Sequence, residues 1–187
     1  MSMQASDETL IARIAAGDRV AMEAFYGRHH VRVFRFVVRL VARRDVAEDV
    51  LSEAFLEVWR LAGRFEGRSS ATTWLMAIAR NKALTEMRRR PMEPLDEARA
   101  ETIPDLADDP EQALQTKGRD RILRHCLSAL SPEHREIIDL VYYHEKSVRE
   151  VSEIVGIPEN TVKTRMFYAR KHLNALVTSA GLDLGER

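Results

Sequence analysis

The stretch from residue 146 to residue 173, KSVREVSEIVGIPENTVKTRMFYARKHL, constrains the fold more than any other part of the chain. Ser147 and Glu150 form the Ser-x-x-Glu pattern that caps the start of a helix, and Gly156 stands where a left-handed turn can end that helix. Pro158 and Asn160 then suit the start of a second helix, whose free N–H groups the Asn160 side chain can cap. The stretch therefore predicts a helix, a short turn and a second helix.

The second helix of this unit has two different faces. Because each helical residue turns about 100°, its apolar residues share one stripe about 60° wide, which should face a core; they are Val162, Met166, Ala169 and Leu173. The opposite side carries cations with two aromatics among them: Lys163, Thr164, Phe167, Tyr168 and Lys171. In a helix-turn-helix unit this helix enters the DNA major groove, so the pattern indicates a DNA-reading face. A solvated face with two stray aromatics is the alternative, since single exposed apolar residues are common.

The composition is that of a globular protein without internal disulfide bonds. The 187 residues are 45% hydrophobic and 31% charged, which suits one moderate core or two small ones. The single cysteine, Cys126, forbids an internal disulfide. The first residues, MSMQASDETL, do not resemble a signal segment, and charges interrupt every apolar run before 18 residues. We therefore expect a cytoplasmic protein with no membrane insertion.

Charge is distributed unevenly along the chain. The 29 basic and 29 acidic residues cancel, which argues against indiscriminate nucleic-acid binding. Residues 91–112, PMEPLDEARAETIPDLADDPEQ, nevertheless hold eight acids against Arg99 alone, a net charge of −7, and their four prolines oppose a helix. We predict an all-α fold of two small helical domains, 1–90 and 113–187, joined by this acidic linker, with the helix-turn-helix in the second domain.

The first domain contains a helix with an unusual exposed face. In DVAEDVLSEAFLEVWR most apolar residues share one side: Ala47, Val50, Leu51, Ala54, Phe55 and Val58. Leu56 lies instead between Asp49, Ser52 and Glu53, so an apolar residue stands at the centre of an acidic face. That face suits a basic partner, although a solvated face with an incidental leucine is an equal alternative.

A second basic surface is predicted before the linker. From Arg80 to Arg90 the chain carries five cations and one acid, with Asn81 and Lys82 on the same helix. Trp74, near the start of that helix, is assigned to the core. The adjacent His29 and His30 cannot both face one metal ion, and we assign both to the surface.

These segments together resemble the RNA polymerase sigma factors of the sigma-70 family, in their extracytoplasmic-function (ECF) group. The resemblance is carried, in order, by AEDVLSEAFLEVWR, FEGRSSATTWLMAIARNKA and the unit that begins at LSPEHREIIDLVYY. It implies that Asp49, Ser52, Glu53 and Leu56 bind the coiled coil of the β′ subunit of core RNA polymerase. It further implies promoter DNA and an anti-sigma factor as partners, and no cofactor or metal.

The resemblance also assigns residues to the two promoter elements. Phe65 and Asn81 would hold a base flipped from the minus-10 element, at a cost of a few kcal/mol for the flip, and the cations Lys82, Arg88, Arg89 and Arg90 would contact phosphates nearby. The minus-35 element would be read by the second helix of the helix-turn-helix unit, through Asn160, Thr161, Lys163, Thr164, Arg165, Phe167, Tyr168, Arg170 and Lys171. Two positions depart from the family: Ser52 stands where glutamine is frequent, and Tyr168 stands where arginine is frequent.

Three other classes of function are less consistent with the sequence. An autonomous helix-turn-helix regulator would leave the first domain without a purpose. An adaptor that mimics a sigma factor and titrates an anti-sigma factor would not need the basic faces. An enzyme is the least consistent, because no phosphate-binding loop, metal-ligand cluster or nucleophile motif occurs.

Overall fold

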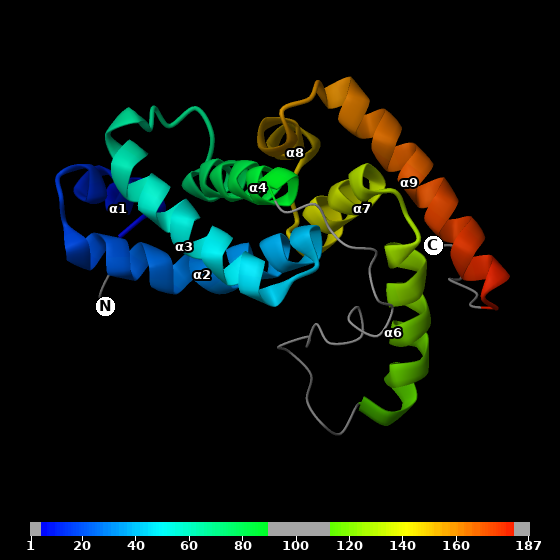
Figure 1. Ribbon diagram of the computed structural model, residues 1–187. Helices are drawn as coiled ribbons and strands as arrows, with labels where there is room; N and C mark the ends of the chain where they lie inside the picture. Colours follow the sequence, from blue (N-terminus) through cyan, green and yellow to red (C-terminus); the bar gives the residue numbers. More distant parts are fainter. Residues whose placement is uncertain (1–4, 90–112, 182–187) are drawn as a thin grey trace. The chain divides into compact units, whose positions relative to one another are not determined.

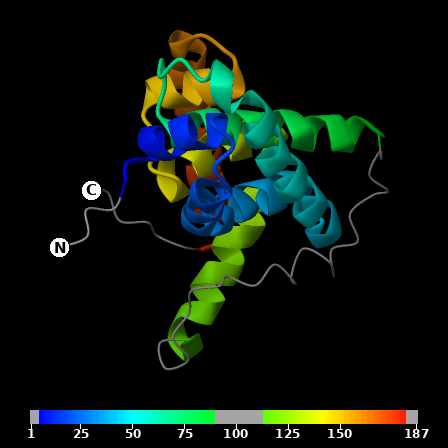
Figure 2. The ribbon, with the colours of Figure 1, turned by 90° about the vertical axis from the view of Figure 1, so that its left-hand side faces the viewer.

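The computed structural model describes residues 5–89 and 113–181, and every regular element in these ranges is a helix (Figures 1 and 2). The chain divides into two units, of which the first holds the helices before residue 90 and the second holds α6, α7 and α9. The predicted all-helical fold with two domains is therefore confirmed. The predicted acidic linker, residues 91–112, lies outside the described residues, as does Arg90.

The first unit is built from four α-helices and one short 3-10 turn. They are α1 (Asp7–Ala15), α2 (Arg19–Val41), α3 (Arg44–Leu61), η1 (Ala62–Arg64) and α4 (Ala71–Arg89). Helix α3 packs against both α2 and α4, and α1 packs against α2. Side-chain caps fix two of the helix starts, because the Ser6 hydroxyl accepts from the Thr9 N–H and the Asp18 carboxylate accepts from the Ala21 N–H. The α2–α3 turn passes through Ala42, whose φ of 53° is left-handed.

The core of the first unit consists mainly of aliphatic side chains together with Phe25, Phe36 and Phe55. One sequence prediction fails here: His29 is only 7% exposed, although we assigned it to the surface. It lies one helical turn after Phe25 and one before Val33, so it belongs to the apolar stripe of α2. Its imidazole packs on Phe25, with ring centroids 4.6 Å apart, and its Nε2 lies 2.8 Å from Oδ2 of Asp7. Burial lowers the pKa of His29, and the carboxylate of Asp7 partly opposes that shift.

The second unit contains α6 (Ala113–Ser128), α7 (Pro132–Ile138), the π-helical segment η2 (Asp139–Tyr143) and α9 (Glu159–Ser179). Leu130, Ile138 and Ala169 form a buried cluster. Arg135 joins α7 to the end of α6, because its guanidinium donates to the carbonyl oxygens of Leu127, Ser128 and Leu130 at 3.1, 2.6 and 3.1 Å. The Ser128 carbonyl is among those that a helix end leaves without an intrahelical partner, and Arg135 satisfies it.

The predicted helix-turn-helix unit is present as α8 (Val148–Val155) followed by α9. The expected capping box is confirmed: the Ser147 hydroxyl accepts from the Glu150 N–H, and the Glu150 carboxylate accepts from the Ser147 N–H at 3.0 Å. Gly156 has a φ of 74°, as expected for a left-handed turn. The prediction that Asn160 caps α9 is wrong, because the helix already begins at Glu159 and Pro158 occupies the cap position without a side-chain bond.

Within the described residues, no helix is long and apolar enough to cross a membrane.

Candidate functional site

The exposed face of α3 has the predicted character. Leu56 is 57% exposed, while Asp49, Ser52 and Glu53 around it are also exposed. All six residues predicted for the opposite side of this helix are buried. Trp59, which sequence reasoning did not single out, is 37% exposed and lies one turn after Leu56. The spacing of Ser52, Leu56 and Trp59 was the available signal, and the apolar part of the face is larger than predicted.

Ion pairs neutralise part of this acidic face. Arg43 pairs with Asp45 and, through this bond, holds the pKa of the Asp45 carboxyl below its ordinary value. The Arg44 Nε lies 3.0 Å from the Glu48 carboxylate. Asp49, by contrast, makes no ion pair with any residue in the described ranges. Asp49 therefore keeps an uncompensated negative charge on the side of α3 that carries Leu56, two helical turns before it.

Helix α4 carries the residues predicted for the minus-10 element. Phe65, in the loop before α4, packs against Trp74 with ring centroids 5.1 Å apart. Trp74 is half-buried in this contact, so its assignment to the core holds only in part. Asn81 and Arg88 are exposed, and they follow Trp74 at intervals of seven residues, or about two helical turns. Trp74, Asn81 and Arg88 therefore share one side of α4.

Two other cations of α4, Lys82 and Arg89, have partners within the first unit. The Lys82 Nζ lies 3.1 Å from the Glu57 carboxylate and 3.8 Å from that of Glu53, so Lys82 joins α4 to α3. The Arg89 guanidinium lies 3.2 Å from the Glu86 carboxylate. The expectation that these two cations contact phosphates stays a prediction, and it requires their present ion pairs to loosen.

The predicted DNA-reading face of α9 is exposed. Phe167 and Tyr168 are 62% and 53% exposed and meet edge to face at 5.4 Å. Lys163, Thr164 and Lys171 are exposed beside them, whereas on the opposite side Val162 and Ala169 are buried and Met166 and Leu173 are half-buried. The periodicity of the sequence therefore identified both sides of this helix correctly.

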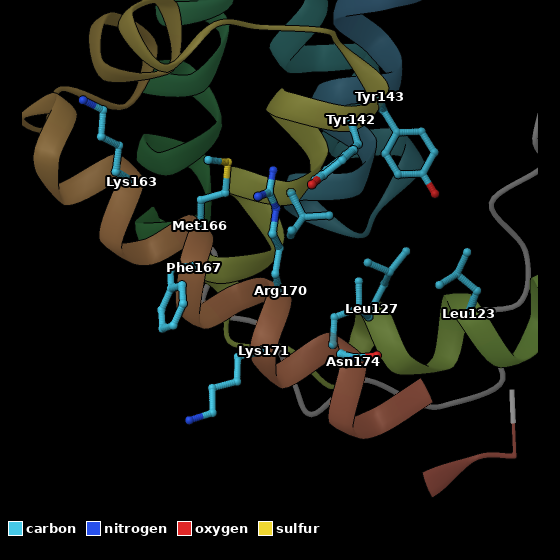
Figure 3. Close-up of a pocket in the computed structure, with 12 residues that line it drawn as sticks. Leu123, Leu127, Tyr142, Tyr143, Lys163, Met166, Phe167, Arg170, Lys171 and Asn174 are labelled. Atoms are coloured by element: carbon cyan, nitrogen blue, oxygen red, sulfur yellow. The ribbon is translucent and has the colours of Figure 1, made fainter. Parts of the chain in front are cut away.

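The other predicted residues of α9 differ in exposure. Asn160 and Arg170 are exposed, while Thr161 and Arg165 are half-buried. The Arg170 guanidinium lies over the ring of Tyr142, 5.5 Å from its centroid. Figure 3 shows Arg170 directed toward Tyr142, while Phe167 and Lys171 project elsewhere from α9. Arg170 thus contributes to the packing between α9 and η2.

An open apolar groove of about 770 Å³ adjoins this face, between α6, η2 and α9 (Figure 3). Leu123 and Leu127 of α6 line it, together with Tyr142 of η2. Lys163, Phe167, Arg170 and Lys171 of α9 also line it, so the groove shares four residues with the predicted DNA-reading set. Sequence reasoning missed the groove because it arises from the packing of helices that are distant in sequence.

Two protein-family models match the chain. The model described as Sigma-70 region 2 matches residues 25–91, and the model described as Sigma-70, region 4 matches residues 120–173. Among curated proteins, the ECF RNA polymerase sigma-E factor of Haemophilus influenzae is 30% identical over 182 residues, which cover 91% of this chain and 95% of that protein. The ECF RNA polymerase sigma factor SigK of Mycobacterium tuberculosis is 32% identical over 170 residues, which cover 89% of this chain and 90% of that protein.

Two of the solved structures with a similar fold are complexes. CnrH, in complex with the cytosolic domain of CnrY, aligns with a TM-score of 0.69 at 21% identity and covers 92% of this chain and 97% of CnrH. The sigma factor RpoE of Bartonella quintana, in complex with the anti-sigma factor NepR, aligns with a TM-score of 0.62 at 25% identity and covers 83% of this chain and 96% of RpoE. The chain therefore belongs to the ECF group of the sigma-70 family, and it is an RNA polymerase sigma factor that directs transcription initiation.

Proposed function

We propose that the exposed face of α3 is the surface through which this sigma factor binds the coiled coil of the polymerase β′ subunit. The observation that carries the proposal is Leu56, which is 57% exposed on the same side of α3 as the unpaired carboxylate of Asp49, two helical turns earlier. An apolar anchor surrounded by acids complements a basic surface that has an apolar contact of its own. Ser52, which replaces a glutamine that is frequent in the family, leaves a smaller polar side chain in this contact.

The exposed side of α4 supports a role at the minus-10 element. Phe65 packs on Trp74, and Asn81 lies about 10 Å further along the same side of the helix. An aromatic ring and an exposed amide arranged in this way can stack on a flipped base and hydrogen-bond to its edge. Arg88 is exposed seven residues after Asn81 on the same side of α4, and its guanidinium is suited to binding a neighbouring phosphate.

The exposed side of α9 supports a role at the minus-35 element. Lys163, Thr164 and Tyr168 offer polar groups, and Phe167 offers an apolar surface that can meet a thymine methyl group. We expect the protein to act in the cytoplasm, where it would meet core polymerase and promoter DNA.

Leu56→Arg tests the polymerase-binding proposal. The new guanidinium would be buried against a basic partner, which costs several kcal/mol when it is not paired, so co-elution with core polymerase should be lost. Because Leu56 is exposed, the circular dichroism spectrum and the unfolding midpoint of the free protein should stay unchanged. Val20→Arg is a matched control, since Val20 is 68% exposed on α2. Unaltered co-elution of the Leu56→Arg variant would refute the proposal.

We further propose that an anti-sigma factor binds the groove between α6, η2 and α9. The supporting observation is that the groove shares Lys163, Phe167 and Lys171 with the predicted DNA-reading face. A segment that covered these side chains would exclude DNA from them, so binding of the two partners would be competitive. The apolar lining with cations at its edge fits an amphipathic helix with an acidic side. Simultaneous binding of minus-35 DNA and the anti-sigma factor, in a titration with both, would contradict this model.

A further inference from the structure

Helix α2 carries a stripe of four arginines that none of the surfaces described above includes. Arg28, Arg32, Arg35 and Arg39 follow one another at intervals of four, three and four residues. At 100° per residue they fall within an arc of about 60° and extend over about 16 Å of the helix. Between Glu23 and Asp45 the sequence contains no carboxylate. We call these four residues the arginine stripe.

The two central members of the arginine stripe lack the ion pairs that other arginines of this unit make. Several other arginines of the first unit pair with a nearby carboxylate, as in Arg13–Asp18 at 2.7 Å and Arg44–Glu48 at 3.0 Å. Arg28, at one end of the stripe, is likewise paired, with Asp7 at 2.9 Å. Arg32 is exposed and Arg35 half-buried, and neither forms a hydrogen bond or ion pair with another residue in the described ranges. Their donors are therefore available to an external anion.

We propose that the arginine stripe binds the phosphate backbone of promoter DNA when the sigma factor is part of the polymerase holoenzyme. A guanidinium presents a planar fork of donors that matches a phosphate. Phosphates of one strand follow one another at about 3.4 Å along a duplex. Arg32 and Arg35 lie about 4.5 Å apart along the helix axis, so their two available guanidinium groups can meet neighbouring phosphates. The net charge of the chain is zero, so this positive potential is local to the stripe and not a general property of the surface.

A nucleic-acid backbone fits the stripe better than an acidic protein does. Protein interfaces usually have an apolar or aromatic centre surrounded by polar residues. Between residues 28 and 39 the arc of the stripe contains only arginines. Val31, an apolar side chain that is 42% exposed, lies outside the arc by about 40°. A row of cations with no apolar centre is suited to a regular row of phosphates. Such contacts position the DNA and carry no sequence information.

The test is the salt dependence of promoter binding by the reconstituted holoenzyme. The probe is a labelled duplex that the wild-type holoenzyme selects from a randomised promoter library. Arg32→Gln and Arg35→Gln should each make the slope of log K against log salt less negative by about 0.9, and the double variant by about twice that amount. The loss in affinity should be equal for strong and weak promoter sequences. Arg32→Lys should keep the wild-type slope, because the positive charge is retained.

Arg19→Gln is the matched control. Arg19 lies on the same helix, is exposed, and is turned about 180° from Arg28, so the same charge change there should leave the slope unaltered. Co-elution with core polymerase is measured for every variant. Unchanged slopes for Arg32→Gln and Arg35→Gln would overturn the proposal. A loss of core-polymerase binding in these variants would also overturn it, since the stripe would then bind an acidic protein surface.

Discussion

Tyr168→Arg should change the base preference of this sigma factor at one position of the minus-35 element. Tyr168 is 53% exposed on the face of α9 that also presents Thr164 and Lys171, one turn before and one turn after it. In the family, arginine is frequent at this position, and an arginine can form a bidentate pair with guanine. A tyrosine has a single hydroxyl and a ring, so the wild-type protein should tolerate several bases at the position that Tyr168 faces.

The magnitude follows from the bond that arginine adds. A good bidentate arginine–guanine pair discriminates by about 1–3 kcal/mol, which is roughly a 5- to 150-fold preference. The substitution should leave the fold intact, because Tyr168 touches Phe167 only edge to face at the surface and the buried stripe of α9 lies on the other side. The added cation can also contact a phosphate. That contact would make the slope of log K against log salt more negative by about one unit without changing base preference. Preference and salt slope must therefore be measured separately.

The assay is selection from a randomised promoter library by holoenzymes that contain wild type, Tyr168→Arg or Tyr168→Ala. The arginine variant should enrich guanine at one minus-35 position, while the alanine variant should stay as permissive as wild type. Identical base profiles for all three proteins would show that Tyr168 does not face a base. A profile altered at several positions at once would refute the single-contact reasoning, because it would indicate a shift of the whole helix in the groove.

Three further predictions concern the first unit. Ala42→Gly should raise the free energy of unfolding by about 0.5–1 kcal/mol, because Ala42 has a left-handed φ of 53°. Ala16→Gly, at a helix end with a φ of −86°, should not raise the free energy of unfolding. Urea unfolding followed by tryptophan fluorescence measures both variants. Burial lowers the pKa of His29, so its stabilising effect is present above its ordinary pKa of 6.5 and is lost as pH falls through the lowered value. Unfolding curves at a series of pH values should therefore show a weaker acid dependence for His29→Gln, and an unaltered dependence would contradict this. Glu57→Gln should release Lys82 to contact a phosphate, which makes the slope of log K against log salt for promoter binding more negative by about one unit. A salt titration of promoter binding by the holoenzyme measures this slope, and an unchanged slope would contradict the prediction.

Helical periodicity made much of the fold predictable from the sequence. On α3 and α9 the rotation of about 100° per helical residue was enough to separate the buried side from the exposed side, and it placed Leu56 on the exposed side. The capping box at Ser147 and the left-handed turn at Gly156 were equally local, since their partners lie within a few residues. Agreement among these local signals is what allowed the two helical domains to be predicted without a structure.

The features that sequence reasoning missed depend on contacts between distant segments. His29 was assigned to the surface because it and the adjacent His30 cannot both face one metal ion, yet its position in the apolar stripe and the nearby Asp7 allow it to be buried. The groove beside α9 needs Leu123 and Tyr142 from elements that lie far away in the sequence. Asn160 was misassigned because proline and asparagine are both favoured near a helix start, and only the structure shows that α9 begins before Asn160.

Lys82 links two surfaces that the proposed function treats separately. Its Nζ lies 3.1 Å from Glu57 and 3.8 Å from Glu53, and Glu53 belongs to the proposed polymerase-binding face of α3. A basic partner that draws Glu53 away would weaken the attraction between α3 and Lys82, and would leave Lys82 freer to approach a phosphate. A phosphate near Lys82 would, by the same reciprocity, leave Glu53 more negative and so more attractive to a basic partner. Polymerase binding and promoter binding should therefore strengthen each other through this ion pair, and the coupling should disappear when Lys82 is replaced by glutamine.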